Sequence, residues 1–510
     1  MDLTPQNSDF MEMISILEKK NRKFKEPSYY RTTEVLSYYL LPFRFQKINS
    51  EKEILVNEVG DFLIVVKGTA EKIILRQLSR TDDEELYYDL ISSFFISEQP
   101  IPQLFPVLEA RYRTKKSFLE HFTALHIFVI SLRCEHTCHY CQVSRVTQDK
   151  DQFDMSLYHI DEGIKIMMQS PNPYVTMEFQ GGEALLAFQN IQYAVIKAKE
   201  QASLYSKQIT FVICTNLAPL TDDMLPFIKE HNILISSSLD GPAFIHNQNR
   251  HRPQRNSYEV TIEGIRKCRE SLGEDNISAL LTTTNLSLDY PEQIVEEYVR
   301  QGFSSIFLRP ISPYGFATYN ENKNKYQTAR FLAFYKTAFE KIIEYNKKGY
   351  FIREDYATVI LKKILTPFPV GYVDLQSPAG LINNVIVFNY DGRIYASDEA
   401  RMLAEMKDYT FQLGILGEST YNEIFYGEKA AEISENWTNE SLAGCSECAF
   451  QSYCGADPVL NYSTQGTMYG YRPTNIFCQK NMEIIRYLFE LMEDRSIEKI
   501  FRSWITGHTV

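Results

Sequence analysis

The sequence lacks any apolar run long enough to cross a lipid bilayer, although 44% of its 510 residues are hydrophobic. Its N-terminus lacks an apolar segment after a basic start, so we expect no secretory signal, a cytoplasmic protein and no membrane partner. Basic residues are outnumbered, 53 Lys and Arg against 65 Asp and Glu, and the net charge is −12. No global field attracts phosphates, so we expect no nucleic-acid partner.

Cysteine is also scarce, with nine residues in the chain. Disulfides are rare in a reducing compartment, so these cysteines are better explained as metal ligands. Seven of them fall into two clusters, while Cys214 and Cys268 stand alone as small buried residues. The length exceeds one ordinary core, and 23% charged residues are typical of a globular chain, which predicts two to four domains.

The first cluster follows the apolar run 125–132, which predicts a buried strand. Its three cysteines have a C-x3-C-x2-C spacing: Cys134, Cys138 and Cys141. Three thiolates can hold three irons of a four-iron, four-sulfur cluster and leave the fourth iron open to a substrate or cofactor. Zinc, with His136 or His139 as a further ligand, or a redox pair is the alternative.

At these residues, with Tyr140 before the last cysteine, the chain resembles the radical SAM (S-adenosylmethionine) superfamily. The resemblance implies a [4Fe-4S] cluster that binds SAM through its open iron. It also implies an enzyme that cleaves SAM reductively to methionine and a 5′-deoxyadenosyl radical.

From residue 125 to about 345 apolar runs alternate with helical patterns. The expected strands are 127–132, 174–179, 209–214, 233–239, 277–283 and 305–308. Six successive strand–helix units predict an α/β fold with a parallel sheet and right-handed crossovers. The count matches the partial (βα)6 TIM-like barrel of radical SAM enzymes, in which chemistry lies at the carboxyl ends of the strands.

Polar motifs follow the expected strands. The second strand ends in Gln180, Gly181, Gly182 and Glu183, where two glycines would let backbone approach a ligand closely. The segment resembles the GGEP motif that binds the amino group of SAM, with Ala184 in place of the proline. The resemblance implies SAM contacts from all four residues.

Further SAM contacts are implied at the ends of the later strands: Asn216, Ser238, Asp240, Arg250 and Ile311. Ser238 and Asp240 lie in a segment that resembles the S-x-D-G-P segment of peptide-modifying members, and Arg250 follows Ser238 by twelve residues. A hydroxyl and a guanidinium suit a ribose and a carboxylate. Without that register, Arg250 would be interpreted as a surface charge. Ile311 is expected against the adenine.

The second cluster consists of Cys445, Cys448, Cys454 and Cys478. It follows a predicted hairpin with its turn at Asp391-Gly392 and resembles the SPASM extension of many radical SAM enzymes. The resemblance implies one auxiliary [4Fe-4S] cluster on four cysteines. Ligands of a second auxiliary cluster are absent, since Ala379, Ser397 and Pro458 stand at those positions. Four-thiolate zinc is the alternative.

Asp398 stands where sulfatase-maturing relatives have a proposed general base. A carboxylate there could take a proton as the substrate radical loses an electron. A hairpin or helix-cap aspartate is the alternative.

At the N-terminal end, residues 1–28 predict a short helix or a loose arm. Two runs, 54–57 and 61–66, predict a hairpin, followed by helices over 70–78 and 83–93. The pattern resembles a peptide-recognition element that adds a leader peptide to a sheet edge, and a packing appendage is the alternative. We expect an N-terminal α+β domain at 1–120, a barrel at 121–350 and an iron–sulfur extension at 351–510 that ends in an amphipathic helix over 481–501.

Three segments resemble the His-Xaa-Ser system radical SAM maturases: 39–45, 391–403 and 454–466. This resemblance implies a precursor peptide substrate with His-Xaa-Ser repeats, companion maturation proteins and an electron donor. Two other hypotheses stay open. One is a sulfatase-type protein maturase, and the other is a non-catalytic metal scaffold that binds a peptide.

Overall fold

The computed structural model describes residues 37–100, 102, 105–141, 149–315 and 326–507. The arm predicted at residues 1–28 lies outside this part of the chain. The chain divides into two compact units, Met1–Leu41 with Glu71–Gln103, and Pro42–Ala70 with Leu104–Val510. The domain boundaries expected near residues 120 and 350 stay predictions.

The smaller unit is built around a short antiparallel pair, β1 (Tyr39–Leu40) with β5 (Ile96–Ser97). Its helix α3 (Glu84–Ser92) begins at Asp83, whose side chain accepts from the backbone N–H of Leu86. The short helix α2 (Thr69–Ile74) begins at the boundary of the two units.

The larger unit contains a three-stranded antiparallel sheet of β2 (Phe43–Lys47), β3 (Lys52–Asn57) and β4 (Phe62–Val66). The register pairs Val56 with Phe62, which confirms the predicted hairpin. The Asn57 side chain closes its turn by accepting from the N–H groups of Val59 and Asp61. Gly60 provides the left-handed backbone that the turn requires.

The central element is an eight-stranded sheet in the order β10-β9-β8-β7-β6-β13-β14-β15. Its parallel strands match the first five predicted ones: β6 (Leu125–Ser131), β7 (Tyr174–Gly181), β8 (Gln208–Thr215), β9 (Leu234–Ser238) and β10 (Ile277–Leu280). Neighbouring strands are consecutive in sequence and joined by helical crossovers, which confirms the α/β class.

The sixth predicted strand differs from the expectation. Only β11 (Ser305–Ile306) forms there, and it pairs with β12 (Arg353–Glu354) in a separate two-stranded sheet. Pro310 has no N–H to continue a ladder, so only an isolated bridge to Thr283 follows. No closed barrel forms among the described strands; the large sheet stays open.

The predicted C-terminal hairpin extends the same sheet. β13 (Val385–Phe388) lies parallel to β6 and antiparallel to β14 (Arg393–Tyr395), which pairs with β15 (Gln412–Ile415). Because β14 runs back antiparallel to β13, the start of α16 (Asp398–Glu405) lies toward the amino end of β6, where Ile382 donates its N–H to the Ala396 carbonyl.

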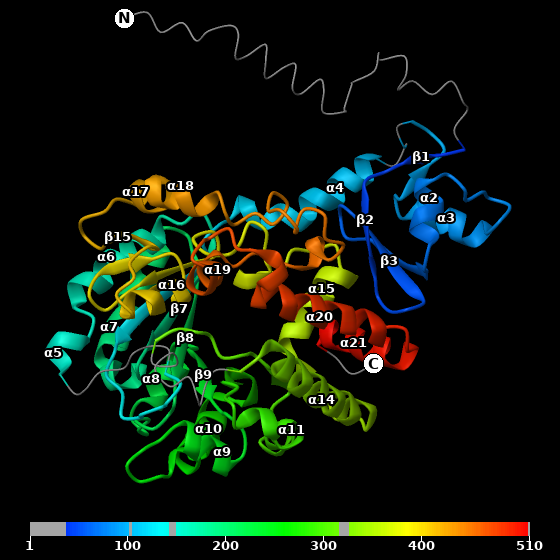
Figure 1. Ribbon diagram of the computed structural model, residues 1–510. Helices are drawn as coiled ribbons and strands as arrows, with labels where there is room; N and C mark the ends of the chain where they lie inside the picture. The colour runs from blue at the N-terminus through cyan, green and yellow to red at the C-terminus, as the bar shows by residue number, and fades with distance from the viewer. Residues whose placement is uncertain (1–36, 101, 103–104, 142–148, 316–325, 508–510) are drawn as a thin grey trace, which may run out of the picture. The chain divides into compact units, whose positions relative to one another are not determined.

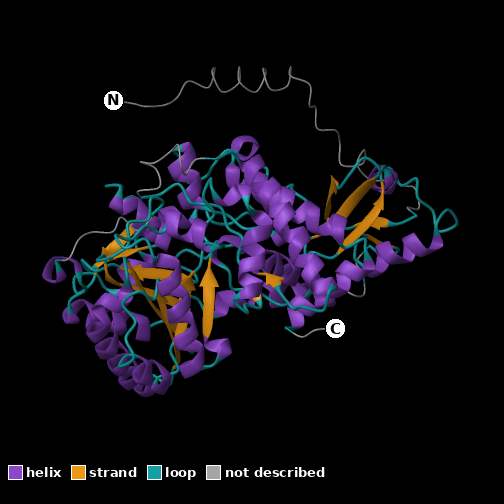
Figure 2. Cartoon of the chain, turned by 90° about the horizontal axis from the view of Figure 1, so that it is seen from below, coloured by secondary structure: helices purple, strands orange, loops and turns teal. Residues whose placement is uncertain are grey.

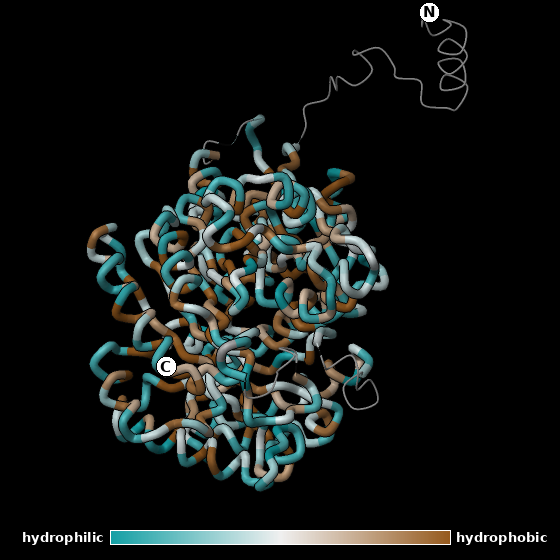
Figure 3. The backbone as a smooth tube through the Cα atoms, turned by 90° about the vertical axis from the view of Figure 1, so that its left-hand side faces the viewer, coloured by the Kyte–Doolittle hydropathy of each residue, from teal (hydrophilic) through white to brown (hydrophobic). Residues whose placement is uncertain are grey.

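Helices cover the outer side of the strands (Figure 2). The helices before, between and after the parallel strands are α4 (Phe105–Lys116), α5 (Lys150–Phe153), α6 (Leu157–Met168), α7 (Phe188–Leu204), α8 (Leu225–Glu230), α9 (Ala243–Asn249), α10 (Ser257–Leu272) and α11 (Pro291–Arg300). On α7 the apolar face of Ile191, Ala194, Val195 and Ala198 is fully buried. Hydrophobic and hydrophilic segments alternate along the backbone in Figure 3.

The C-terminal part is mostly helical (Figure 1). Its helices are α14 (Thr328–Lys347), α15 (Asp355–Leu365), α17 (Tyr421–Tyr426), α18 (Glu428–Ser434), α19 (Pro458–Gln465), α20 (Ile476–Leu491) and α21 (Arg495–Thr506). The single helix predicted over 481–501 is wrong, because Asp494 accepts from the N–H of Ser496 and starts a second helix. Among the described helices, none has the length and apolarity of a membrane span.

Candidate functional site

The cysteine loop and the Gly-Gly segment are interlocked at the carboxyl edge of the large sheet. Gly182 donates its N–H to the Ser131 carbonyl at 2.8 Å, and Glu183 donates to the Arg133 carbonyl at 2.8 Å. A Cβ on Gly182 would lie 2.5 Å from the carbonyl oxygens of Leu132 and Arg133. The two glycines are therefore needed for contact with the start of the cysteine loop, where the sequence had suggested contact with a ligand.

An ion pair anchors the start of this loop. Arg133 donates from Nε and Nη2 to the Asp154 carboxylate, at 2.7 Å each, and from Nη2 to the Leu186 carbonyl. Both charged side chains are nearly buried. A bidentate pair holds its geometry well, so the loop leaves β6 in a fixed direction. The sequence carried no spacing signal for Asp154.

Glu183 is 1% exposed and faces the protein rather than an open site. Its carboxylate accepts from the N–H of Leu185, the hydroxyl of Thr215 and the N–H of Asn216. Burial raises the pKa of Glu183 to about 7. In this arrangement the carboxylate ties the ends of β7 and β8 together.

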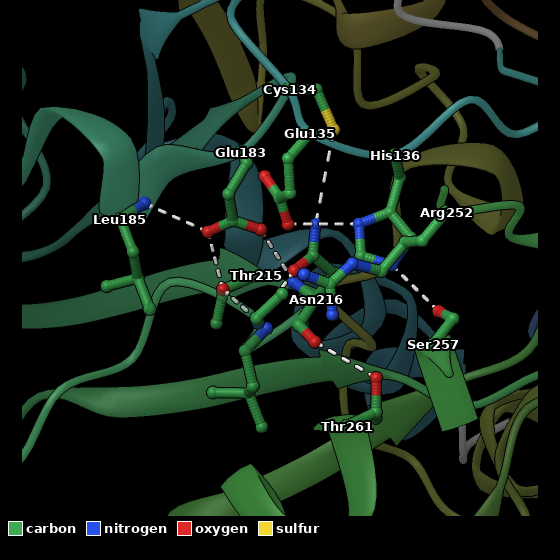
Figure 4. A network of polar contacts seen from close by, with 12 residues as sticks. Cys134, Glu135, His136, Glu183, Leu185, Thr215, Asn216, Arg252, Ser257 and Thr261 are labelled. Carbon is green, nitrogen blue, oxygen red and sulfur yellow. Dashed lines mark hydrogen bonds and ion pairs between the residues drawn. The ribbon is translucent and has the colours of Figure 1, made fainter. Parts of the chain in front are cut away.

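Around Cys134 the polar groups form a network (Figure 4). The Asn216 amide lies 4.0 Å from the Cys134 sulfur. His136 bonds through Nδ1 to Glu135 and through Nε2 to Ser257, at 3.0 and 2.7 Å. Ligand atoms of Cys134, Glu135 and His136 all lie within 4.8 Å of one another. Both imidazole nitrogens are engaged, so His136 would have to give up a bond to bind zinc.

Tyr140, Asp240 and Arg250, three of the residues at which SAM contacts are implied, meet in one cluster. The Tyr140 hydroxyl donates to Asp240 at 2.7 Å, and Arg250 Nε lies 3.2 Å from the other Asp240 oxygen. The Arg250 guanidinium also stands 5.5 Å from the centre of the Tyr140 ring. Arg250 is largely buried, which excludes the surface-charge interpretation. His246 is buried, accepts from the Asp240 N–H and bonds through its other ring nitrogen to Ser257.

The other predicted SAM contacts are placed as follows. Gln180 donates to the buried Glu178 at 2.6 Å. Ser238 is the last residue of β9 and is partly exposed. Ile311 lines a large cavity at the carboxyl end of the sheet region.

The four C-terminal cysteines line one small cavity of about 30 Å³. Burial raises the pKa of Cys448 to about 12, and the sulfurs of Cys454, Cys478 and Cys445 add to this. Four sulfurs close enough to repel as thiolates need a bound cation to stay deprotonated. This donor set fits an iron–sulfur cluster or zinc, and all four thiols are free.

Residues that the sequence did not single out support this cavity. The Asn481 amide lies 3.5 Å from the Cys454 sulfur. Lys363 donates to the Cys454 carbonyl at 2.7 Å, and burial lowers the pKa of this lysine to about 7. A Cβ on Gly455 would meet the carbonyls of Asp374 and Gln376. None of these residues has a motif of its own, since they come from segments far apart in sequence.

The positions that lack a ligand have structural roles. Ser397 accepts from the N–H of Ala400 and caps α16. Pro458 is the first residue of α19, where its missing N–H costs nothing. Ala379 is buried.

Asp398 is not the helix cap. It is the first residue of α16 and pairs at 3.0 Å with Arg401, which is 1% exposed. The hairpin or helix-cap alternative is therefore wrong, and the aspartate belongs to a buried ion pair. Its charge helps burial to raise the pKa of Glu178.

The three-cysteine loop fits the group that its sequence implied. Its sulfurs are partly buried, and burial raises the pKa of Cys134, to which the charges of Glu135 and Cys138 add. A bound cation would reverse that effect and hold the thiolates.

Residues 128–298 match the model of the Radical SAM superfamily. A cysteine-type anaerobic sulfatase-maturating enzyme of Clostridium novyi is 24% identical over 72% of this chain and 96% of its own length. The structure of anSMEcpe with bound AdoMet matches with a TM-score of 0.60 and 19% identity, covering 73% of this chain and 99% of that one. Streptococcus suis SuiB bound to precursor peptide SuiA matches with a TM-score of 0.50 and 12% identity, over 86% and 99%.

The motifs, the sheet and the family match agree with one another. The family implies a [4Fe-4S] cluster and SAM as cofactors. Residues 128–298 therefore form a radical SAM domain, and the chain is an iron–sulfur enzyme of the maturase type.

Proposed function

We propose that this enzyme modifies a ribosomally made precursor peptide by radical SAM chemistry. The observation that carries the proposal is the close backbone contact of residues 181–183 with residues 131–133, directly before the three cysteines, at the carboxyl edge of the parallel sheet. Cys134, Cys138 and Cys141 are the cluster ligands in this proposal. When bound, the cluster and SAM supply the one-electron chemistry that activates a C–H bond of the substrate.

The residues of the chain hold SAM in defined ways. Arg250, fixed by Asp240 and Tyr140, offers its remaining N–H donors to a carboxylate. Ser238 offers a hydroxyl at the end of β9. Gln180, Gly181, Gly182 and Asn216 line the proposed SAM site, and Ile311 provides an apolar contact to the adenine. Glu183 supports these segments by accepting hydrogen bonds from Thr215 and Asn216, which join the ends of β7 and β8.

The C-terminal cysteines hold one auxiliary [4Fe-4S] cluster in this proposal. Four thiols around one cavity support it, together with the Asn481 amide beside Cys454. An amide donor to a cluster sulfur stabilises the more reduced state, which suits electron transfer. Zinc is the competing occupant.

The substrate proposal rests on the matches to maturases. SuiB is solved with its precursor peptide, and its fold covers most of this chain. We propose a precursor peptide with His-Xaa-Ser repeats, together with companion maturation proteins and an electron donor. The three-stranded sheet β2–β3–β4 is a candidate for leader-peptide binding, since β2 and β4 are its edges.

Single cysteine variants of the anaerobically reconstituted protein test the two cluster sites. We expect Cys138→Ala to lose about half of the iron and all SAM cleavage, because each site holds about four irons. Cys448→Ala should lose the other half and keep SAM cleavage. Cys268→Ala, a buried cysteine far from both motifs in sequence, is the matched control and should keep both. A wild type that holds about four irons and one zinc, with only the zinc lost in Cys448→Ala, would remove the auxiliary cluster from the proposal.

A sulfatase-type substrate is the second candidate, favoured by the relative from Clostridium novyi. Mass spectrometry after turnover with a His-Xaa-Ser repeat peptide and with a cysteine-containing sulfatase peptide separates the two. Modification of the repeat peptide alone supports the first proposal, and modification of the sulfatase peptide alone supports the second. Tight peptide binding without any SAM cleavage would instead support the scaffold hypothesis.

A further inference from the structure

A large cavity, of about 510 Å³, lies in the larger unit beyond the carboxyl end of β11. Its wall comes from residues 307–314, from α14, α15, α16, α19 and α20, and from the segment 372–374. This volume is that of a small-molecule or side-chain pocket. Ile311 places the cavity beside the proposed adenine contact, and Phe477 lines both this cavity and the four-cysteine cavity.

Five charged side chains line the cavity: Arg309, Asp374, Glu399, Asp457 and Lys480. Among the described residues, no side-chain hydrogen bond or ion pair is formed by the carboxylates of Asp374 and Glu399. Asp457 accepts only from the N–H of Leu460. All five side chains are half-buried, and a charge that has lost part of its water is stabilised by a partner. Lys480 and Arg309 lie near enough to act on the pKa of Asp374, but no ion pair joins them to it among the described residues.

The two cationic side chains of the cavity, Lys480 and Arg309, lie near aromatic rings that stabilise their charge. The Lys480 ammonium stands 4.5 Å from the centre of the Tyr356 ring and 5.4 Å from that of Phe477. The Arg309 guanidinium stands 5.9 Å from the centre of the Phe307 ring. Aromatic faces stabilise a cation but offer nothing to a carboxylate. Three carboxylates against two cations leave one negative charge in excess when all are ionised.

A tyrosine hydroxyl gives an independent sign of a missing ligand. Tyr314 lines the cavity and is 1% exposed, and its hydroxyl forms no hydrogen bond of standard geometry among the described residues, although the Ser463 side chain lies near it. Burial raises its pKa, and the charges of Asp457, Glu399 and Asp374 add to this. A buried hydroxyl without a partner in a wall of this kind is a free donor and acceptor.

We propose that this cavity binds a substrate side chain that carries a positive charge, with Asp374 and Glu399 as the receiving carboxylates and Tyr314 as a further polar contact. The inference rests on the proposed function, since it takes a peptide as the occupant. It adds a selection rule: the residue next to the proposed SAM site is basic. An ammonium or guanidinium brings several N–H donors to acceptors that have none.

An acidic side chain is the opposite possibility, because Arg309 and Lys480 could receive a carboxylate. It would leave Asp374 and Glu399 without donors and bring a further negative charge to a cavity that already has an excess of one. The cation therefore satisfies more of the groups present.

Binding to the reconstituted full-length enzyme tests the proposal without turnover. The probes are three capped tripeptides, Gly-X-Gly, in which X is lysine, norleucine or glutamate, and the dissociation constants come from saturation-transfer NMR. We expect the lysine peptide to bind about tenfold tighter than the norleucine peptide, the effect of charge-assisted hydrogen bonds at a buried site. Equal binding of these two peptides, or tightest binding of the glutamate peptide, would overturn the proposal.

Two substitutions locate the effect. Glu399→Gln and Asp374→Asn should each reduce the preference for lysine over norleucine about fivefold or more. Glu405→Gln, on the same helix as Glu399 but outside the cavity, is the matched control and should keep the preference. A preference that survives both cavity substitutions would also contradict the assignment, and circular dichroism verifies that each variant folds.

The outcome is separable from that of the proposed function. SAM cleavage by the wild type, measured without peptide, tests the radical enzyme. Cleavage without a preference for lysine refutes only the cavity inference, whereas a preference for lysine without cleavage refutes only the proposed chemistry.

Discussion

At the residue scale, the buried charges outside the large cavity have partners. Glu354 is the clearest example, because its two carboxylate oxygens accept from the N–H groups of Leu308, Tyr356 and Ala357 and from the Tyr335 hydroxyl. It caps α15 and ties β12 to the residues that follow β11. Asp398 and Arg401 form a second such site.

Glu354→Gln tests how much this carboxylate contributes to the free energy of unfolding. The substitution replaces one carboxylate oxygen by an amide nitrogen, which cannot accept, so the hydrogen bonds to that oxygen are lost. Each buried group left without a partner costs about 1–3 kcal/mol. Burial raises the pKa of Glu354 from its ordinary value near 4.5 to about 7. A raised carboxyl pKa in the folded state makes the wild type lose stability as pH rises from 4.5 to 7, by about 3 kcal/mol from this group.

We therefore expect a lower free energy of unfolding for Glu354→Gln and a flatter dependence on pH across that interval, both measured by urea unfolding. The exposed Glu259→Gln is the control and should keep the wild-type slope. An unchanged pH slope in Glu354→Gln would contradict the role given to this carboxylate.

Asp398→Asn separates a structural aspartate from a catalytic one. The substitution removes the ion-pair partner of the buried Arg401 guanidinium, whose Nη1 already has no partner in the described chain. We expect a loss of about 3 kcal/mol in stability, seen as a clearly lower melting temperature. An unchanged melting temperature with SAM cleavage intact and peptide modification lost would instead support the general base.

At the element scale, the contact between the cysteine loop and the Gly-Gly segment decides the geometry of the site. Two backbones approach closely there, and any side chain on Gly182 meets the carbonyls of Leu132 and Arg133. The strands themselves need no such device, since β6, β7 and β8 are held by a regular parallel ladder.

Gly182→Ala should displace the cysteine loop. The added methyl group overpacks the contact, and we expect a cost of about 1–3 kcal/mol together with a strong loss of cluster binding at the three-cysteine site. Iron content and melting temperature measure the two effects. Gly371→Ala is the matched control, because a Cβ there meets nothing within 4 Å. Wild-type iron content in Gly182→Ala would show that the loop tolerates the displacement.

Helices and strands were predictable from the sequence where one hydrophobic periodicity dominates a segment. The five parallel strands, the buried face of α7 and the two hairpins follow from apolar runs and turn residues. The sixth strand did not, because Pro310 interrupts a run that alone looks extended. The C-terminal helix pair was predicted as one helix, since the apolar pattern continues past the cap at Asp494.

The site residues were predictable where a motif has a fixed spacing. The spacing of the four C-terminal cysteines predicted one shared site, and the four thiols line one cavity. The twelve-residue spacing from Ser238 identified Arg250, which is largely buried beside Asp240. Asp154, Lys363 and the charged lining of the large cavity depend on tertiary contacts between distant segments, for which a single sequence carries no signal.

At the scale of the whole molecule, the larger unit contains the three-cysteine loop, the large cavity and the four-cysteine cavity. Residues after β11 form one wall of the large cavity, and α20 leads from Cys478 to Lys480 in its opposite lining. The cavity thus adjoins both the proposed SAM contact at Ile311 and the C-terminal thiols.

The most direct test is reductive SAM cleavage by the wild type. The protein is reconstituted without oxygen, its iron and sulfide are counted, and 5′-deoxyadenosine is measured after addition of dithionite and SAM. We predict about eight irons per chain and formation of 5′-deoxyadenosine, as two four-iron clusters require. Iron-loaded protein that forms no 5′-deoxyadenosine, with or without the repeat peptide, would contradict the account.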